Sequence, residues 1–360
     1  MTEWKTYKLS EITIMRNGKK RPSSKGCYPV YGGNGIMDYA DSFNAENTII
    51  VGRVGAYCGN VYQSKGKCWV SDNAISVSAN ELTDSNYLYY LMSSLDFHRH
   101  HIGGAQPLIT QDIIGGFEIS LPSLEEQRRI AGILGAIDDK IENNRRINAN
   151  LESQAQALFD RMFFENNEKE RSLLSLCANI NPTRTLRQGT NARYIEMANL
   201  PTKGSFPTDW TFKPFNGGVK FTNGDTIMAR ITPCLENGKT AYIDFLEKEE
   251  VAFGSTEYII ISAKDGYCPA LFYFLARNKE FVDYAVGHMN GSSGRQRVSG
   301  ADIANFPMPN ISIEESDKFA QFAMPIMDVI RRNSLENRTL ATLRDTLLPK
   351  LMNGEIKVSE

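Results

Sequence analysis

The chain has 360 residues and a formal net charge of −2 at pH 7, from 40 basic and 42 acidic side chains. This length allows two domains that each bury a hydrophobic core. The balanced charge provides no overall field for binding nucleic acid, and no apolar run approaches the roughly 18 residues of a membrane span. We therefore expect no association with a membrane.

The cysteines and the N-terminus indicate a cytoplasmic protein. Six cysteines are scattered along the chain without a C-x-x-C pair, which favours reduced thiols over a disulfide framework or a zinc site. The N-terminal stretch lacks the apolar core and the cleavage site of a signal peptide. Local basic clusters, such as the one at Lys19, Lys20 and Arg21, fit contacts to phosphates. An ordinary solvated surface explains each single cluster equally well.

Residues 1–121 are predicted to form the first domain. Short β-rich runs broken by glycine and asparagine, with a short helix near 86–95, indicate an α/β module with a largely antiparallel sheet. The stretch YGGNG (31–35) is predicted to be a turn, because the residues after it open a helix poorly and do not suit a nucleotide-binding loop. HRHH (98–101) lacks a fourth metal ligand at a suitable spacing, so we expect a solvated helix end there.

Residues 122–165 are predicted to form one long helix. Ser123 and Glu126 form a capping box, and the helix that follows contains no proline. After the cap, positions separated by alternating steps of four and three residues form the seam of a coiled coil. These positions are Ile130, Leu134, Ile137, Ile141, Asn144, Asn148, Leu151, Ala155, Leu158 and Met162.

Residues 166–310 are predicted to form a second α/β domain that resembles the first only faintly. The stretch 225–243 parallels 47–62, and the stretch 291–303 parallels 103–113. A short helix is expected near 270–278. Because the two domains differ much more than the helices do, we expect one scaffold that carries two domains with different targets.

Residues 311–360 repeat the first helix. Each seam position of the first helix recurs later in the chain at the same difference in residue number, which is the difference between Ser123 and Ser312. Ser312 and Glu315 form the second capping box. Most seam positions are again apolar, and both asparagines recur, which indicates an internal duplication. The second seam consists of Phe319, Ala323, Ile326, Ile330, Asn333, Asn337, Leu340, Arg344, Leu347 and Leu351. We call this constant difference in residue number the repeat offset.

The two helices are predicted to pack antiparallel. This arrangement places Asn144 opposite Asn337 and Asn148 opposite Asn333, and buried asparagines fix the register of a coiled coil. It also gives the short connection, since the first helix ends where the second domain begins. A proline at position 325 predicts a kink, and position 344 places an arginine in the seam. The predicted fold class is α+β, with two α/β domains, two long helices that form a coiled-coil spacer, and a pseudo-twofold internal repeat.

Polar loops in both domains are rich in side chains that recognise bases. Arginine pairs with guanine, and asparagine and glutamine pair with adenine. Each of these side chains could instead solvate a turn. The candidates for DNA contact are Lys19, Lys20, Arg21, Asn34, Arg53, Tyr57, Gln106 and Gln111 in the first domain, and Arg230, Asn290, Ser293, Arg295, Gln296 and Arg297 in the second.

No catalytic motif is found in the sequence. There is no N/D-P-P-aromatic motif of an amino-methyltransferase, no G-x-S-x-G elbow and no Walker loop. No cluster of carboxylates and lysines suits a nuclease. We therefore expect no catalytic residue, no metal site and no cofactor on this chain.

The sequence resembles the specificity subunits of type I restriction–modification systems over essentially its whole length. The stretches that carry the resemblance are PVYGGNGI, GDTIMARITPCLENGK, LPSLEEQRRIAGIL with the helix after it, and LRDTLLPKLMNGEI. The resemblance implies target recognition domains at 1–121 and 166–310, with spacer helices at 122–165 and 311–360.

The resemblance also implies a function. Each recognition domain would bind half of a bipartite, asymmetric site in double-stranded DNA. The subunit itself would be non-catalytic and would recruit two modification subunits, which carry S-adenosylmethionine and methylate adenine. Restriction subunits that translocate DNA would join through them. Two alternatives are a methyltransferase or nuclease with its own catalytic site, and a coiled-coil adaptor that never contacts DNA.

Overall fold

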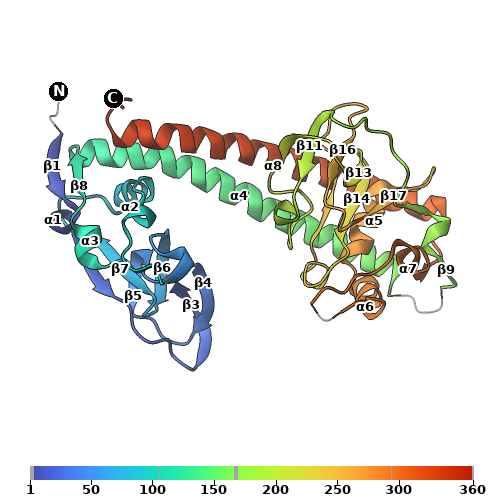
Figure 1. The fold of residues 1–360 in the computed structure, drawn as a ribbon, viewed down its shortest axis with the longest axis horizontal. Helices are drawn as coiled ribbons and strands as arrows, with labels where there is room; N and C mark the ends of the chain where they lie inside the picture. The colour runs from blue at the N-terminus through green and yellow to red at the C-terminus, as the bar shows by residue number, and fades with distance from the viewer. Residues whose placement is uncertain (1–3, 105, 166–168, 293, 359–360) are drawn as a thin grey trace. The chain divides into compact units, whose positions relative to one another are not determined.

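Two long helices organise the chain (Figure 1). Helix α4 spans Leu124–Phe163 and helix α8 spans Ile313–Met352, each with 40 residues, which corresponds to about 60 Å for a straight helix. The computed structural model describes residues 4–104, 106–165, 169–292 and 294–358. The chain divides into two compact units: unit 1 comprises Met1–Lys140 and Thr339–Glu360, and unit 2 comprises Ile141–Arg338. Each long helix therefore contributes residues to both units.

Unit 1 contains a six-stranded sheet in the order β2-β7-β5-β6-β3-β4, in which the pairing of β3 with β6 is parallel and the others are antiparallel. Strands β1 and β8 form a separate antiparallel ribbon. The strands are β1 (Lys5–Lys8), β2 (Thr13–Asn17), β3 (Lys25–Gly32), β4 (Gly35–Ala40), β5 (Ala45–Gly52), β6 (Val61–Val70), β7 (Ala74–Ala79) and β8 (Glu118–Leu121). The YGGNG stretch is the turn between β3 and β4, as predicted.

Short helices connect these strands: α1 (Leu9–Ile12), α2 (Ser85–Ser94) and α3 (Gln111–Gly115), with 3-10 helices η1 (Gly55–Tyr57) and η2 (Phe97–His100). Helix α2, predicted near 86–95, begins after Asp84, whose carboxylate accepts hydrogen bonds from the next turn. Its buried Leu88 belongs to a core that also contains Val77 of the sheet and Leu134 of α4. Helix α2 therefore joins the sheet to the long helix (Figure 1).

Unit 2 contains two four-stranded sheets, in the orders β10-β17-β14-β15 and β12-β11-β16-β13, and a ribbon of β18 and β9. Only the pairing of β11 with β16 is parallel among the described strands of this unit. The strands are β9 (Arg171–Leu173), β10 (Ala178–Ile180), β11 (Asn191–Ile195), β12 (Thr211–Pro214), β13 (Val219–Phe221), β14 (Asp225–Ala229), β15 (Thr240–Tyr242), β16 (Ala252–Gly254), β17 (Tyr258–Ala263) and β18 (Pro307–Pro309).

The helices of unit 2 include two, α6 (Lys279–Gly287) and α7 (Gly300–Ala304), that the sequence did not predict. The unit also contains α5 (Pro269–Arg277) and the 3-10 helices η3 (Leu174–Leu176) and η4 (Met197–Asn199). Asn278 ends α5 and also caps α6, because its side chain accepts hydrogen bonds from the first turn of α6. Two helices separated by a single position produce a continuous pattern in the sequence, which explains why α6 was missed.

The strand orders confirm the internal repeat. The order β2-β7-β5-β6 in unit 1 corresponds to β10-β17-β14-β15 in unit 2, and the ribbon of β1 and β8 corresponds to that of β9 and β18. Helix α2 corresponds to α5, and α3 to α7. The two units thus share a topology although their sequences are faintly similar.

The seam of unit 2 has the antiparallel register. Asn144 donates from Nδ2 to Asn337 Oδ1 at 2.9 Å, and Asn333 donates from Nδ2 to Asn148 Oδ1 at 2.8 Å. Further along, the Phe159 ring packs on Phe319, with ring centroids 5.7 Å apart. The seam residues of this unit that are buried or half-buried include Ile141, Asn144, Asn148, Leu151, Leu158, Ile326, Ile330, Asn333 and Asn337.

The seam of unit 1 explains the arginine at position 344. Arg344 donates from Nη1 to Asp138 Oδ1 of α4 at 2.7 Å, and Tyr90 of α2 donates its hydroxyl to the other carboxylate oxygen at 2.7 Å. Ile130 and Leu351 are buried in the same core. The half-buried seam residues of this unit include Ile137, Leu340 and Leu347.

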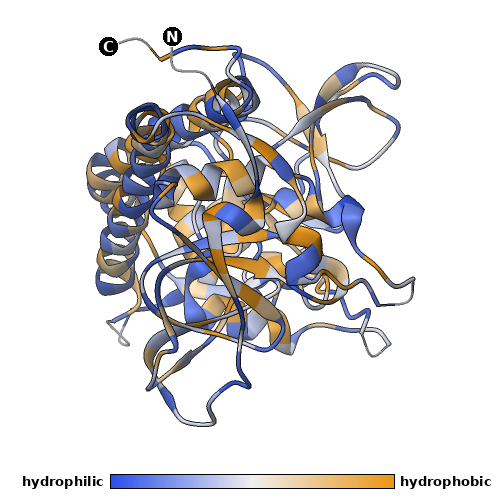
Figure 2. Cartoon of the chain, turned by 90° about the vertical axis from the view of Figure 1, so that its left-hand side faces the viewer, coloured by the Kyte–Doolittle hydropathy of each residue, from blue (hydrophilic) through white to orange (hydrophobic). Residues whose placement is uncertain are grey.

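Helix α8 is continuous across its exposed prolines, so the kink expected at Pro325 does not interrupt the helix. Hydrophilic and hydrophobic residues are interspersed in the helices as well as in the strands (Figure 2). At the start of α8, Ser312 and Glu315 form the complete predicted capping box. No helix within the described ranges is long and apolar enough to cross a membrane.

The starts of both long helices bind the short helix of their own unit in the same way. Gln127 is fully buried and accepts from the backbone N–H of Asp84, the cap of α2, at 2.9 Å. Ser316, its equivalent by the repeat offset, accepts from the backbone N–H of Cys268, the cap of α5, at 2.7 Å. The sequence analysis did not identify this pair, because a polar residue in the first turn of a helix is ordinarily exposed.

Candidate nucleic-acid interface

One end of the unit 1 sheet brings the predicted contact residues together. Strands β2 and β5 both end beside the start of β7, since Asn17 pairs with Ile75 and Gly52 pairs with Ala74. Lys19 bridges to the adjoining turn at Ser71. The loops after β2 and β5, and the turn before β7, therefore lie at the same end of the sheet.

Arg53 follows directly after β5, and its backbone is held from both sides. Its N–H donates to Asn73 O, and its carbonyl accepts from the N–H of Ile109, both at 2.9 Å. A little further on, Gly55 N–H donates to Pro107 O at 2.9 Å. The Arg53 side chain is half-buried.

Arg230 follows β14 in unit 2 with the same backbone arrangement. Its N–H donates to Glu257 O, and its carbonyl accepts from the N–H of Val298, both at 3.0 Å. A little further on, Thr232 N–H donates to Gln296 O at 3.0 Å. The Arg230 Nε is buried and has no hydrogen-bond partner within the part of the chain that the structure describes.

A hairpin completes the arrangement in each unit. In unit 1, Ile102 and Leu108 exchange backbone hydrogen bonds of 2.9 Å, and in unit 2 Asn290 and Arg297 do the same at 2.9 Å. We name these segments hairpin 1 (102–108) and hairpin 2 (290–297). A helix follows each hairpin, capped by Thr110 in unit 1 and by Ser299 in unit 2.

Most predicted residues of unit 1 lie at this end of the sheet. Lys19, Lys20 and Asn34 are exposed, and Tyr57 and Gln106 are exposed on η1 and hairpin 1. Two others have partners within the protein. Arg21 forms an ion pair with Asp38 at 3.2 Å, and Gln111 donates from Nε2 to Asn17 Oδ1 at 3.0 Å.

The predicted residues of unit 2 lie on hairpin 2 and beside Arg230. Arg295 is exposed, Gln296 is half-buried, and Asn290 donates from Nδ2 to the His288 carbonyl at 2.9 Å. Ser293 lies outside the described residues. Contact of any of these side chains with DNA remains a prediction.

Arg297 already has a partner. Its Nε donates to Glu257 Oε2 at 2.9 Å and its Nη2 donates to Oε1 at 2.6 Å. These hydrogen bonds hold the pKa of Glu257 below its usual range. The sequence analysis missed Glu257, because it lies far from Arg297 in the chain and no local pattern joins them. Arg297 is therefore placed to hold hairpin 2 against the sheet.

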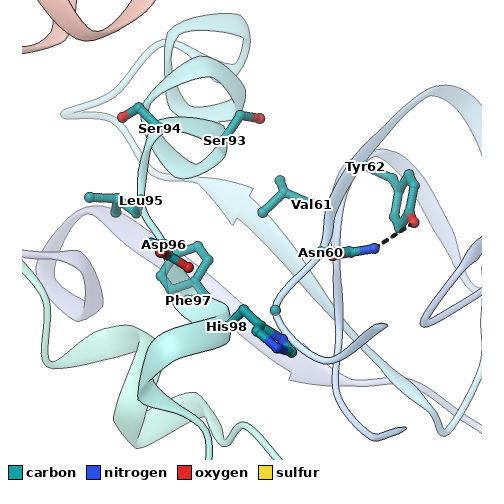
Figure 3. Close-up of a pocket in the computed structure, with 10 residues that line it drawn as sticks. Asn60, Val61, Tyr62, Ser93, Ser94, Leu95, Asp96, Phe97 and His98 are labelled. Atoms are coloured by element: carbon teal, nitrogen blue, oxygen red, sulfur yellow. Dashed lines mark hydrogen bonds between the residues drawn. The ribbon is translucent and has the colours of Figure 1, made fainter. Parts of the chain in front are cut away.

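A pocket of about 450 Å³ in unit 1 is lined by residues 59–62 and 93–98 (Figure 3). Asn60 points toward the Tyr62 hydroxyl on one wall, and the residues from 93 to 98 form the other. The His98 Nδ1 lies 2.9 Å from Cys58 O, and a side chain at Gly59 would collide with the backbone of His98. These contacts hold the loop after Arg53 against the chain that enters hairpin 1.

The histidines of the HRHH stretch were predicted to end a helix and not to bind a metal. They lie on and after η2, and no group of three or more His, Cys, Asp or Glu side chains suited to a metal occurs within 4–104, 106–165, 169–292 and 294–358.

Comparison with known proteins shows which proteins the chain is similar to. Residues 1–153 match the family model described as "Type I restriction modification DNA specificity domain". This part of the chain therefore matches the DNA specificity domain of type I restriction–modification systems, and the chain is similar to their specificity subunits. This assignment confirms the resemblance noted in the sequence.

The proteins that the chain resembles include curated proteins and a solved structure. The EcoprrI specificity subunit of Escherichia coli is 30% identical over 146 residues, which cover 38% of this chain and 36% of that protein. The MjaIX specificity subunit of Methanocaldococcus jannaschii is 26% identical, over 77% of this chain and 70% of that protein. The crystal structure of the S subunit from M. genitalium is 16% identical with a TM-score of 0.66, covering 98% of this chain and 96% of that one. This last likeness confirms the fold.

Proposed function

We propose that this chain is the DNA-specificity subunit of a type I restriction–modification complex. Each recognition domain, at 1–121 and 166–310, binds one half of a bipartite, asymmetric site in double-stranded DNA. The observation that supports this most strongly is the duplicated arrangement around Arg53 and Arg230. Both units hold an arginine and a hairpin at the same sheet end by equivalent backbone hydrogen bonds, while the exposed side chains differ.

The spacer helices, at 122–165 and 311–360, set the distance between the half-sites and dock two modification subunits. Two pairs of exposed apolar residues support two equivalent docking surfaces. Leu124 and Ile313 are 37% and 51% exposed, and Ile133 and Phe322 are 39% and 42% exposed. The members of each pair are related by the repeat offset, so the duplication has kept apolar side chains on the surface at the same helical positions.

The chemistry belongs to the partners. The modification subunits bind S-adenosylmethionine and methylate adenine, the restriction subunits join through them, and the complex works in the cytoplasm. The specificity subunit contributes the choice of sequence and carries no catalytic residue of its own.

Mapping methylated adenines tests this function. The complete set of subunits is expressed in cells, and the methylated sites are sequenced with and without this chain. We expect methylation at one bipartite sequence that disappears without it. A purified chain that binds S-adenosylmethionine and methylates DNA alone would support the alternative of an enzyme with its own catalytic site.

A further inference from the structure

The two hairpins are equivalent residue by residue on their returning strands. Ile109 and Val298 make the same backbone hydrogen bond to Arg53 and Arg230, and their numbers differ by the repeat offset that relates the two long helices. The duplication therefore extends without insertion from the second half of each hairpin into the long helix, so residues there can be paired by number.

Gln106 and Arg295 occupy the same place by this count. Gln106 precedes Ile109 and Arg295 precedes Val298 by the same number of residues. Both side chains are exposed. The adjoining positions, Pro107 and Gln296, accept equivalent backbone hydrogen bonds at 2.9 and 3.0 Å. The backbone that presents the two side chains is thus held in the same way.

The two side chains differ in what they recognise. A glutamine amide pairs with N6 and N7 of adenine, whereas an arginine guanidinium pairs with O6 and N7 of guanine. The other arginine of hairpin 2 is not available for this, since Arg297 donates to both oxygens of Glu257. Among the described positions from 106 to 108 and from 295 to 297, which pair by the repeat offset, Gln106 and Arg295 are the pair whose members are both exposed.

We infer that Gln106 and Arg295 are equivalent specificity-determining residues, which recognise an adenine in the first half-site and a guanine at the corresponding position of the second. Arg297 is a positioning residue that acts through Glu257. This inference rests on the proposed function, and it adds which residue of each hairpin selects a base.

The test exchanges the two side chains in the complete complex. Gln106→Arg is assembled with the modification subunits, and binding is measured against duplexes in which each base pair of both half-sites is varied singly. We expect one adenine of the first half-site to be replaced by guanine in the preferred sequence, and the second half-site to stay unchanged. The duplex with guanine at that position should bind about 5- to 150-fold more tightly than the duplex with adenine. Arg295→Gln should produce the reciprocal change in the second half-site.

A control substitution elsewhere on the chain tests whether an added positive charge alone changes the base preference. Gln154→Arg adds the same charge at an exposed position of α4 and should leave the preferred sequence unchanged. Unaltered base preference in Gln106→Arg, or a loss of binding that no single base change restores, would overturn the inference. Failure of the unsubstituted complex to select any bipartite sequence would instead contradict the proposed function.

Discussion

Asn144 of α4 donates its side-chain N–H to the side-chain carbonyl of Asn337 of α8 at 2.9 Å. Asn144 is 1% exposed and also donates to Glu336 Oε2 at 2.7 Å, so replacing it takes a buried donor away from two acceptors, which is costly. Asn144→Leu alone should therefore lower the free energy of unfolding by about 1–3 kcal/mol. The double variant Asn144→Leu/Asn337→Leu should recover much of this loss. Urea denaturation measures both, and a single variant as stable as the unsubstituted chain would show that the pair does not matter.

The ion pair in the seam of unit 1 makes a second prediction. Arg344→Leu leaves the Asp138 carboxylate with the Tyr90 hydroxyl but without its cation. We expect destabilisation of about 1 kcal/mol, because the ion pair is partly exposed and solvent screens it. Adding Asp138→Asn should reduce the loss. A double-mutant cycle by thermal unfolding measures the coupling, and additive effects would mean that the two residues act independently.

Asp244 makes unit 2 sensitive to pH. Burial raises the pKa of Asp244 to about 7, the neighbouring Asp328 adds to the rise, and the Arg331 guanidinium opposes it. The unfolded chain releases this proton near pH 4, so stability falls as pH rises from about 4 to about 7. The ionisation of Asp244 lowers the free energy of unfolding by at most about 1.4 kcal/mol per pH unit in this range.

Asp244→Asn removes that slope. The variant should match the unsubstituted chain near pH 4 and be more stable at pH 8, because an amide cannot ionise. Urea denaturation at pH 5, 6, 7 and 8 compares the two. Parallel pH profiles would show that the pKa of Asp244 is the same in the folded and unfolded chains, although its Oδ1 is buried.

The repeated exposed residues predict two docking surfaces. Ile133→Lys or Phe322→Lys should each lower the number of bound modification subunits from two to one, since a charge opposes burial of an apolar contact. Ile147→Lys is the matched control: Ile147 is 40% exposed, but its repeat equivalent, Glu336, is charged, so it belongs to no apolar pair. Analytical ultracentrifugation measures the stoichiometry, and two bound subunits in both variants would refute these surfaces.

A heptad insertion tests the spacer. Seven residues inserted after Ala149, and seven between Arg332 and Asn333, keep the seam in phase and add roughly 10 Å. This corresponds to about three base pairs, which also rotate one half-site by roughly a quarter turn or more. We expect weak recognition of a longer-spaced site or loss of activity, with each half-site sequence unchanged. Full methylation at the original spacing would show that the helices do not set the distance.

The sequence predicted the parts of the fold that depend on short periodic patterns. The seam, its asparagine register and both capping positions follow from residues within a few turns of each other, and the structure has them. The partner of Arg344 did not follow, because Asp138 lies beside the seam and Tyr90 comes from a different helix. The kink predicted from Pro325 stays a prediction: α8 runs unbroken through the exposed Pro325.

The candidate interface was predicted as a set of residue types and not as an arrangement. Loop chemistry selected Arg53 and Arg230, but their equivalence depends on hydrogen bonds between segments far apart in the chain. The same limit hid Glu257, and it made Arg297 look as available as Arg295. Local patterns indicate which side chains can recognise a base, whereas long-range pairing decides which of them are free to do so.

We propose that each domain recognises its own half-site. Exchanging residues 1–121 for the corresponding domain of another specificity subunit, and sequencing methylated DNA from cells with the complete complex, measures this directly. We expect the first half-site to change while the second half-site and the spacing stay the same. If both half-sites changed together, the two domains would not act independently and the account would be contradicted.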